Sequence, residues 1–119
     1  MRNASIALLL ATLILFFAGC GKDPEQMSDA ELGLNSQQAR GRRIFHITCI
    51  GCHPAYSSHG NKGPGLKGVF KRPYLPSGLT ATDEHVTDTI LNGRQMMPAF
   101  GNQLDQRDVQ DLLAYLHTL

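Results

Sequence analysis

The chain has 119 residues, of which 42% are hydrophobic and 18% are charged, and its formal net charge is +1. This length is typical of one domain, and the small net charge excludes a strongly polybasic nucleic-acid-binding protein. Three cysteines would leave one unpaired in a scaffold built from disulfides.

The first predicted element is an export signal over residues 1–19. Arg2 precedes thirteen uncharged residues from Ile6 to Ala18. This length fits the apolar core of a secretory signal and is shorter than the about 20 residues of a spanning helix. The segment ends in Phe17-Ala18-Gly19-Cys20, which resembles the signal of bacterial lipoproteins, and we expect Cys20 to carry the lipid. The alternative is an ordinary secretory signal followed by an incidental cysteine.

The remaining chain divides into a lipidated N-terminus with a flexible tether (20–35) and one domain (36–119). Residues 22–35 are polar and carry four acidic residues against one basic residue, so they are poor core formers. We expect a helix from Ser36, acting as its N-cap, into the region of Cys49. Residues 57–78 hold five glycines and three prolines and are predicted to form a long loop, which in a small domain indicates a function such as wrapping a large ligand.

Two further helices are expected after this loop. One runs from about Thr82, a candidate cap, to Leu91, and Gly93 ends it. The last covers about 105–116, and its apolar residues share one stripe at helical spacing: Val109, Leu112, Leu113 and Leu116. No segment has a sustained strand pattern, so the predicted fold class is all-α.

The sequence Cys49-Ile50-Gly51-Cys52-His53 is the attachment motif of haem c. Two thiols at this spacing can form thioethers with the two vinyl groups of one porphyrin, and the adjacent histidine then faces the iron. The alternatives are a thioredoxin-like dithiol, which needs a strand context, and half of a zinc site, which needs a second pair of ligands. The sequence contains no pattern for either.

From about Ser36 to Leu119 the chain resembles class I (mitochondrial-type) bacterial c-type cytochromes. The resemblance implies a cytochrome c fold of three to four helices and long loops around one covalently bound haem c. It follows the attachment motif and four further groups of residues: Gly41 with Phe45, Gly63-Pro64-x-Leu66-x-Gly68-Val69-x-x-Arg72, Met97-Pro98-Ala99-Phe100 and Leu112-Leu113-Ala114-Tyr115-Leu116.

The resemblance also implies a ligand set. His53 is the expected proximal ligand, and Met97 is the expected distal ligand because the family places the ligating sulfur directly before a proline. The Pro64 carbonyl is expected to accept a hydrogen bond from the proximal imidazole. Arg72 is expected to bind a haem propionate, and Tyr74 is a second candidate for this role. Met96 is expected to fill an apolar gap. Four histidines are rival distal ligands: His46, His59, His85 and His117.

The resemblance further implies that Gly41, Phe45 and Tyr115 form the crossing of the first and last helices. Five apolar residues are expected to supply the haem shell and helix packing: Leu66, Val69, Phe100, Leu112 and Leu116. Because haem would provide much of the core, we expect the chain without haem to be poorly folded.

Charge is segregated along the sequence. Residues 40–72 contain seven basic residues and no acidic ones. These bases either surround the haem edge and attract a redox partner with an acidic docking patch, or scatter over several faces.

The predicted function is an extracytoplasmic one-electron carrier with His/Met-ligated haem c. We expect it on the periplasmic side of a bacterial membrane, anchored by lipid, as a monomer or as a subunit of a complex. We identify no catalytic residues. The alternatives are an electron-accepting subunit of a periplasmic dehydrogenase or reductase complex and a haem-based gas sensor.

Overall fold

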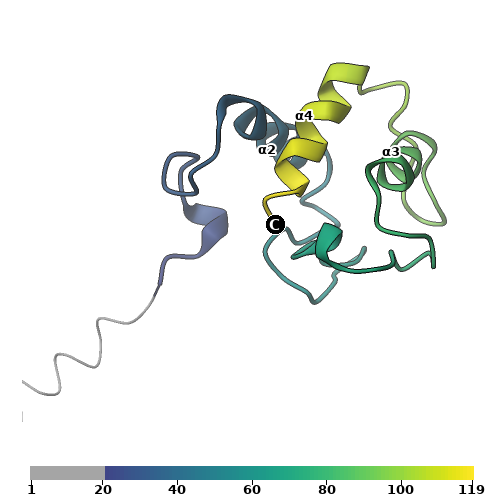
Figure 1. Cartoon of the computed structure of the whole chain (residues 1–119), viewed down its shortest axis with the longest axis horizontal. Coiled ribbons are helices and arrows are strands. Elements are labelled where there is room, and N and C mark those ends of the chain that lie inside the picture. Colours follow the sequence, from purple (N-terminus) through teal and green to yellow (C-terminus); the bar gives the residue numbers. More distant parts are fainter. Residues whose placement is uncertain (1–20) are drawn as a thin grey trace, which may run out of the picture.

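The computed structural model describes residues 21–119, so the predicted export signal and Cys20 lie outside the described residues. Within this range the chain is helical, with two isolated bridges and no named strand, which confirms the all-α prediction. Among these residues no helix is both long enough and apolar enough to span a bilayer. The elements, shown in Figure 1, are the 3₁₀ helix η1 (Pro24–Gln26), α2 (Ser36–Thr48), the 3₁₀ helix η2 (Val69–Lys71), α3 (Asp83–Asn92) and α4 (Gln106–Leu116).

The start of α2 differs by one residue from the prediction, because Asn35 rather than Ser36 is its N-cap. Asn35 Oδ1 accepts from the Gln38 amide at 2.9 Å, and Gln38 Oε1 accepts from the Asn35 amide at 2.9 Å. This reciprocal capping box needs a side chain with a hydrogen-bond acceptor three residues after the cap. Ser36 has Ala39 at that position, which cannot return the hydrogen bond.

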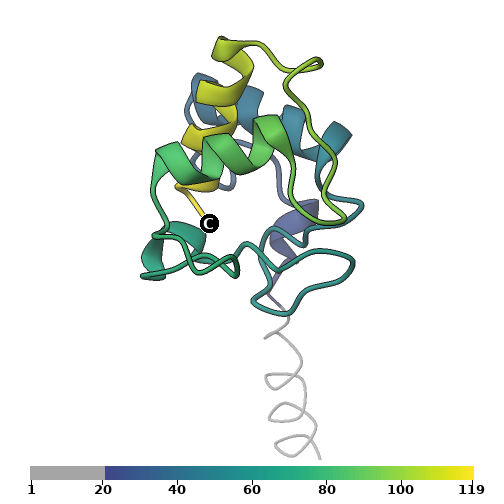
Figure 2. The same ribbon diagram turned by 90° about the vertical axis from the view of Figure 1, so that its right-hand side faces the viewer.

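The predicted boundaries of the other two helices are close to those observed. Thr82 caps α3 by accepting from the His85 amide at 3.3 Å, and Gly93 ends the helix with φ of 71°. Asp105 caps α4 through a second capping box with Asp108. Figure 2 shows α3 side-on, with α2 and α4 crossing behind it and the long loop below.

The crossing of α2 and α4 holds the core together, as expected for Gly41, Phe45 and Tyr115. A Cβ atom on Gly41 would lie 1.9 Å from the Asp111 carbonyl oxygen, so only glycine permits this approach of the two backbones. The rings of Phe45 and Tyr115 are fully buried and lie 5.5 Å apart. Arg40 also joins the two helices, donating from Nε and Nη2 to the Asp111 carboxylate at 2.6 and 3.0 Å.

The segment before α2 makes defined contacts with the domain, although its composition predicts a flexible tether. Leu34 packs against the core, and Arg42 of α2 donates to Asp29 Oδ1 at 2.9 Å. Parts of the described segment 21–35 therefore contact the domain, at Asp29 and at Leu34.

Candidate haem-binding site

The two cysteines of the attachment motif lie where α2 ends. The Cys49 amide donates to the Phe45 carbonyl at 2.8 Å, and the Cys52 and His53 amides donate back to the Cys49 carbonyl at 3.0 and 2.9 Å. This compact turn presents both thiols, which are free and half-buried. Burial raises the pKa of the Cys49 thiol, an effect partly offset by its contact with the Thr48 hydroxyl.

His53 is held by the loop that follows, as the family resemblance implies. Its Nδ1 atom lies 2.9 Å from the Pro64 carbonyl oxygen. Because a carbonyl only accepts, Nδ1 carries the proton and Nε2 is left with a lone pair that can ligate a metal. Nε2 has no hydrogen-bond partner among the residues that the structure describes.

Gly63, which the family resemblance includes without a role, positions His53. A Cβ atom there would lie 2.3 Å from Cε1 of the His53 ring, so the loop backbone rests directly against the imidazole. The Gly63 amide also donates to the Cys52 carbonyl at 3.0 Å, which joins the loop to the attachment motif. The sequence signal was the glycine directly before Pro64.

Arg72 binds the same loop. Its Nη2 atom donates to the carbonyl oxygens of Lys67 and Gly65 at 2.6 and 3.1 Å. Gly65 is itself enclosed, since a Cβ atom there would lie 2.2 Å from the Ser57 carbonyl oxygen. Arg72 therefore fixes the fold of the loop, whether or not it also binds a propionate.

Met97 sits at the end of a tight turn. The backbones of Arg94 and Met97 exchange hydrogen bonds at 3.0 and 2.9 Å, and Gln95 in the turn has φ of 54°. Met97 is half-buried and packs against the core. Met96 is 87% exposed, so the prediction that it fills an apolar gap is wrong. The turn is the physical reason, because it directs these two successive side chains to different environments.

Three of the four rival histidines have partners in the protein. Nε2 of His46 lies 3.5 Å from Glu25 Oε2, and Nδ1 of His85 lies 2.9 Å from the Thr80 carbonyl oxygen. His117 lies 2.7 Å from Asp83 and stacks on Phe70 with ring centroids 3.9 Å apart. His59 is exposed. Met97, in contrast, is a half-buried side chain that packs against the core cluster.

The five apolar residues expected to surround the haem or to pack the helices all lie in or against the core. Among the expected shell residues, Val69, Leu112 and Leu116 are buried, whereas Leu66 and Phe100 are only half-buried and pack against the same core, as Met97 does. Free thiols, an imidazole with an available Nε2 and a soft thioether are the donor set of a haem c site. The residues present therefore fit haem c. A groove of about 760 Å³ between α3 and α4 includes none of the attachment or ligand residues.

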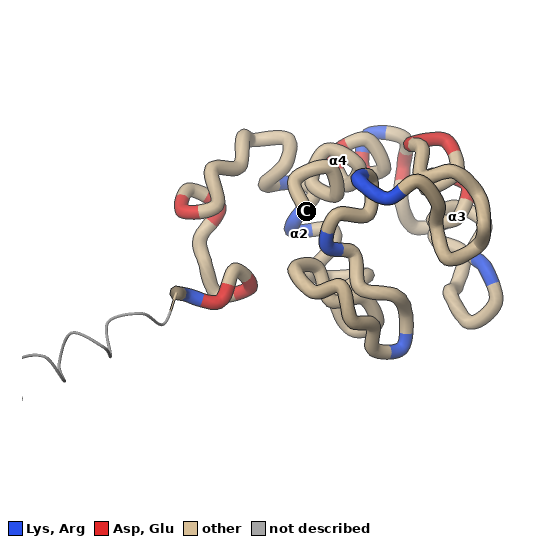
Figure 3. The backbone as a smooth tube through the Cα atoms, turned by 60° about the horizontal axis from the view of Figure 1, so that its bottom comes forward, with Lys and Arg blue, Asp and Glu red and all other residues tan. Residues whose placement is uncertain are grey.

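Most of the seven basic residues between 40 and 72 are used within the domain. Arg40 and Arg42 bind carboxylates, Lys71 donates to the Leu119 carbonyl at 3.0 Å, and Arg72 binds its own loop. Figure 3 shows that the basic positions are spread along the tube rather than gathered at one place.

A helical domain that carries this motif and this donor set is a c-type cytochrome domain. The chain belongs to the family described as cytochrome c oxidase, cbb3-type, subunit III, which matches residues 36–116. It is similar to the cbb3-type cytochrome c oxidase subunits FixP of Azorhizobium caulinodans (34% identical over 94 residues) and CcoP of Azospirillum (30% over 107).

These matches cover 78% and 80% of this chain but only 31% and 35% of the two subunits, so the chain spans about a third of their length. It is also similar to cytochrome c6 of Pyropia yezoensis, at 26% identity over 87 residues, covering 73% of this chain and 76% of the relative. Membership of this family implies haem c and a role in electron transport, and Cys49 and Cys52 are in place for the attachment.

Proposed function

We propose that the chain binds one haem c through thioethers to Cys49 and Cys52, with His53 and Met97 as axial ligands, and carries single electrons. When bound, haem c supplies one-electron chemistry between ferrous and ferric iron. The observation that carries the proposal is the 2.9 Å contact between His53 Nδ1 and the Pro64 carbonyl, which leaves Nε2 available directly after the two thiols.

The residues around the site have separate tasks. Pro64 fixes the tautomer of His53 and raises its basicity as a ligand. Met97 offers a soft neutral thioether, which favours ferrous iron and raises the reduction potential relative to a nitrogen ligand. Neither task needs an acid, a base or a nucleophile, so the proposed role is that of a carrier and not of a catalyst.

The proposed location is the periplasmic side of a bacterial membrane. It is supported by the export-signal pattern in residues 1–19 and by the cysteine at position 20. Two or three acyl chains on Cys20, each contributing about 0.8 kcal/mol per buried methylene group, would hold the protein stably on the bilayer.

An acidic redox partner is a further part of the proposal. Three basic side chains of the 40–72 block have no side-chain hydrogen bond or ion pair among residues 21–119: Arg43, Lys62 and Lys67. They are exposed and available to steer a partner. We expect electron transfer to slow as ionic strength rises. This salt dependence should be weaker in a variant with all three residues changed to glutamine. A rate independent of salt would contradict it.

A second candidate is a subunit of an oxidoreductase complex, which is close to the predicted alternative of an electron-accepting subunit in a periplasmic dehydrogenase or reductase complex. The similarity to cbb3-type oxidase subunits favours it. Co-purification of the tagged chain with a catalytic subunit supports this role, and a free chain that reduces and reoxidises in the membrane fraction supports the simple carrier.

The test of the ligand set compares Met97→Ala with the matched variant Met96→Ala. We expect Met97→Ala to lower the midpoint potential in a spectroelectrochemical titration and to let carbon monoxide bind the reduced form. Met96→Ala should change neither, because Met96 is exposed. An unchanged spectrum and potential in Met97→Ala would refute the assignment, and rapid carbon monoxide binding to the unaltered protein would favour a gas sensor.

A further inference from the structure

Residues 23–29, which we name the clasp, form a folded segment ahead of α2. Asp23 Oδ1 accepts from the Glu25 amide at 3.1 Å and caps η1. The Gln26 amide donates to the Asp23 carbonyl at 2.9 Å. Backbone hydrogen bonds of this kind give the segment a defined shape before it reaches α2.

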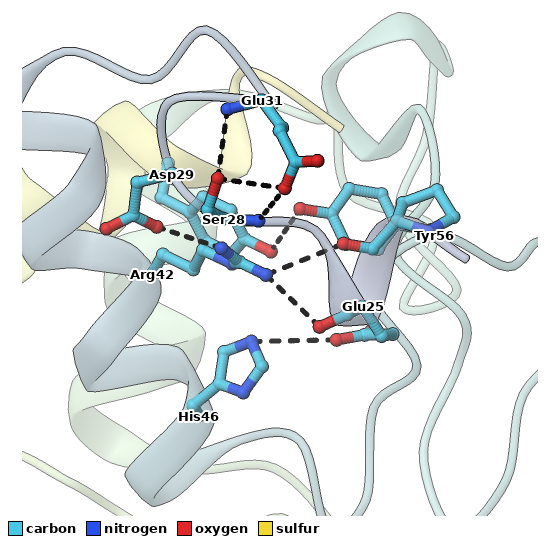
Figure 4. A network of polar contacts seen from close by, with 9 residues as sticks. Glu25, Ser28, Asp29, Glu31, Arg42, His46 and Tyr56 are labelled. Carbon is cyan, nitrogen blue, oxygen red and sulfur yellow. Dashed lines mark hydrogen bonds and ion pairs between the residues drawn. The ribbon is translucent and has the colours of Figure 1, made fainter. Parts of the chain in front are cut away.

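Arg42 fastens the clasp to α2. This arginine is only 8% exposed, and a buried guanidinium is tolerated only when it is paired. Its Nη1 atom donates to Asp29 Oδ1 at 2.9 Å, and Nη2 donates to the Glu25 carbonyl at 3.2 Å. Figure 4 shows the guanidinium between these two parts of the clasp. One side chain of α2 thus binds both ends of the segment.

A second contact lies one helical turn further along α2, where His46 Nε2 is 3.5 Å from Glu25 Oε2. Residues on either side of the clasp also contact it or each other. Glu31 accepts from the Ser28 amide and hydroxyl, both at 2.9 Å, and pairs with Lys22. Lys22 and Ser28 together lower the pKa of the Glu31 carboxyl to about 2. The Lys22–Glu31 ion pair thus lies two residues after Cys20.

We infer that the clasp fixes the domain relative to its membrane attachment point and thereby sets which face meets the lipid bilayer. This inference rests on the lipid anchor proposed at Cys20. A free tether of residues 20–35 would reach about 55 Å, from about 3.4 Å per residue. With the clasp closed, the free span from Cys20 to Asp23 reaches only about 10 Å. A domain of 100 residues has a radius of gyration of about 13 Å. Because this exceeds the reach of the Cys20–Asp23 span, the domain cannot rotate freely relative to the bilayer.

The consequence is that the haem site is held at one orientation to the bilayer. The bound surface is the face formed by the clasp and the neighbouring part of α2, and its partner is a lipid headgroup layer. A redox partner must then approach from the sides that this orientation leaves open, which favours partners that are themselves at the membrane.

The test uses the full lipidated holoprotein in oriented planar bilayers and measures the linear dichroism of the haem absorption bands. We expect clear dichroism in the unaltered protein and its loss in Arg42→Gln. Arg43→Gln is the matched control, since Arg43 is the exposed neighbour on α2, and it should keep the dichroism. If Arg42→Gln does not fold, Asp29→Asn replaces it as the test variant. The Asp29 side chain is 38% exposed, so this change disturbs the fold less.

A second variant separates orientation from packing. A Gly/Ser insertion of about six residues between Gly21 and Lys22 adds up to about 20 Å of reach and leaves the clasp intact. It should abolish the dichroism while the Gln26 and Met27 amides keep their protection from hydrogen exchange. In Asp29→Asn we expect the loss of both the dichroism and the amide protection, with hydrogen exchange at Gln26 and Met27 about tenfold faster.

Isotropic absorption of the unaltered, membrane-bound protein would overturn the orienting role and leave the proposed carrier function standing. Full dichroism in both the insertion and the Asp29→Asn variant would overturn it as well. A chain found only in the soluble fraction would remove the proposed anchor, and the orienting role with it.

Discussion

Replacing Gly41 by alanine tests whether the contact of α2 with α4 determines the stability of the domain. The added Cβ atom would lie 1.9 Å from the Asp111 carbonyl oxygen and 2.9 Å from Tyr115 Cβ, whereas ordinary contacts begin at 3.4 Å. The helix backbones must therefore separate by the difference, about 1.5 Å. The obstacle is backbone, so no side chain can rotate away, and Phe45 and Leu112 lose packing as the helices part.

Overpacking of a core costs about 1–3 kcal/mol, and here the upper end applies. The better helix propensity of alanine offsets about 1 kcal/mol. The net loss is then about 2 kcal/mol, which lowers Tm by about 8–16 °C in a domain of this size. Thermal unfolding of the holoprotein by circular dichroism measures it. Gly51→Ala is the control, because nothing lies within 4 Å of its added Cβ atom. A Gly41→Ala variant that melts with the unaltered protein would refute the reasoning.

Three further predictions concern other contacts of the domain. Tyr115→Phe removes the hydrogen bond between two tyrosine hydroxyls 3.0 Å apart and should lower the free energy of unfolding in urea by about 1 kcal/mol; no change would show that the bond contributes nothing. The hydrogen bonds from Arg40 lower the pKa of Asp111 below its ordinary 3.8. The ionised Asp111 carboxylate therefore adds its full contribution to the free energy of unfolding above pH 3.8, and this contribution is lost as the pH falls further. In Asp111→Asn the free energy of unfolding should fall less steeply as the pH is lowered through this range. Gly63→Ala drives a Cβ atom into the His53 ring and should disturb the haem spectrum, while an unaltered spectrum would contradict the positioning role of Gly63.

The helices could be predicted because their signals are local. The stripe of α4 and the cap Thr82 are read from neighbouring residues. Asn35 was missed because the choice between two adjacent capping residues depends on what stands three positions later. The attachment motif was recognisable for the same reason, since its chemistry lies within five consecutive residues.

The parts that could not be predicted depend on contacts between distant segments. Arg40 meets Asp111 from 71 residues away, and this pairing removes it from the expected basic surface. Arg42 converts part of the expected tether into a packed segment through Asp29, a polar contact that composition does not encode. The turn at Gln95 decides that Met96 is exposed and Met97 half-buried, although both are methionines next to each other.

The most direct test of the central claim is a pyridine haemochrome assay with a redox-difference spectrum on membrane and soluble fractions. We predict haem that resists acid–acetone extraction, a spectrum of haem c with both vinyl groups saturated, and reversible reduction in the membrane fraction. The variant with Cys49→Ala and Cys52→Ala should lose the covalently bound haem and, with it, the haem c spectrum and the reversible reduction. Haem that is extracted by acid–acetone, or a double variant that keeps its covalent haem, would contradict the attachment on which the proposed function rests.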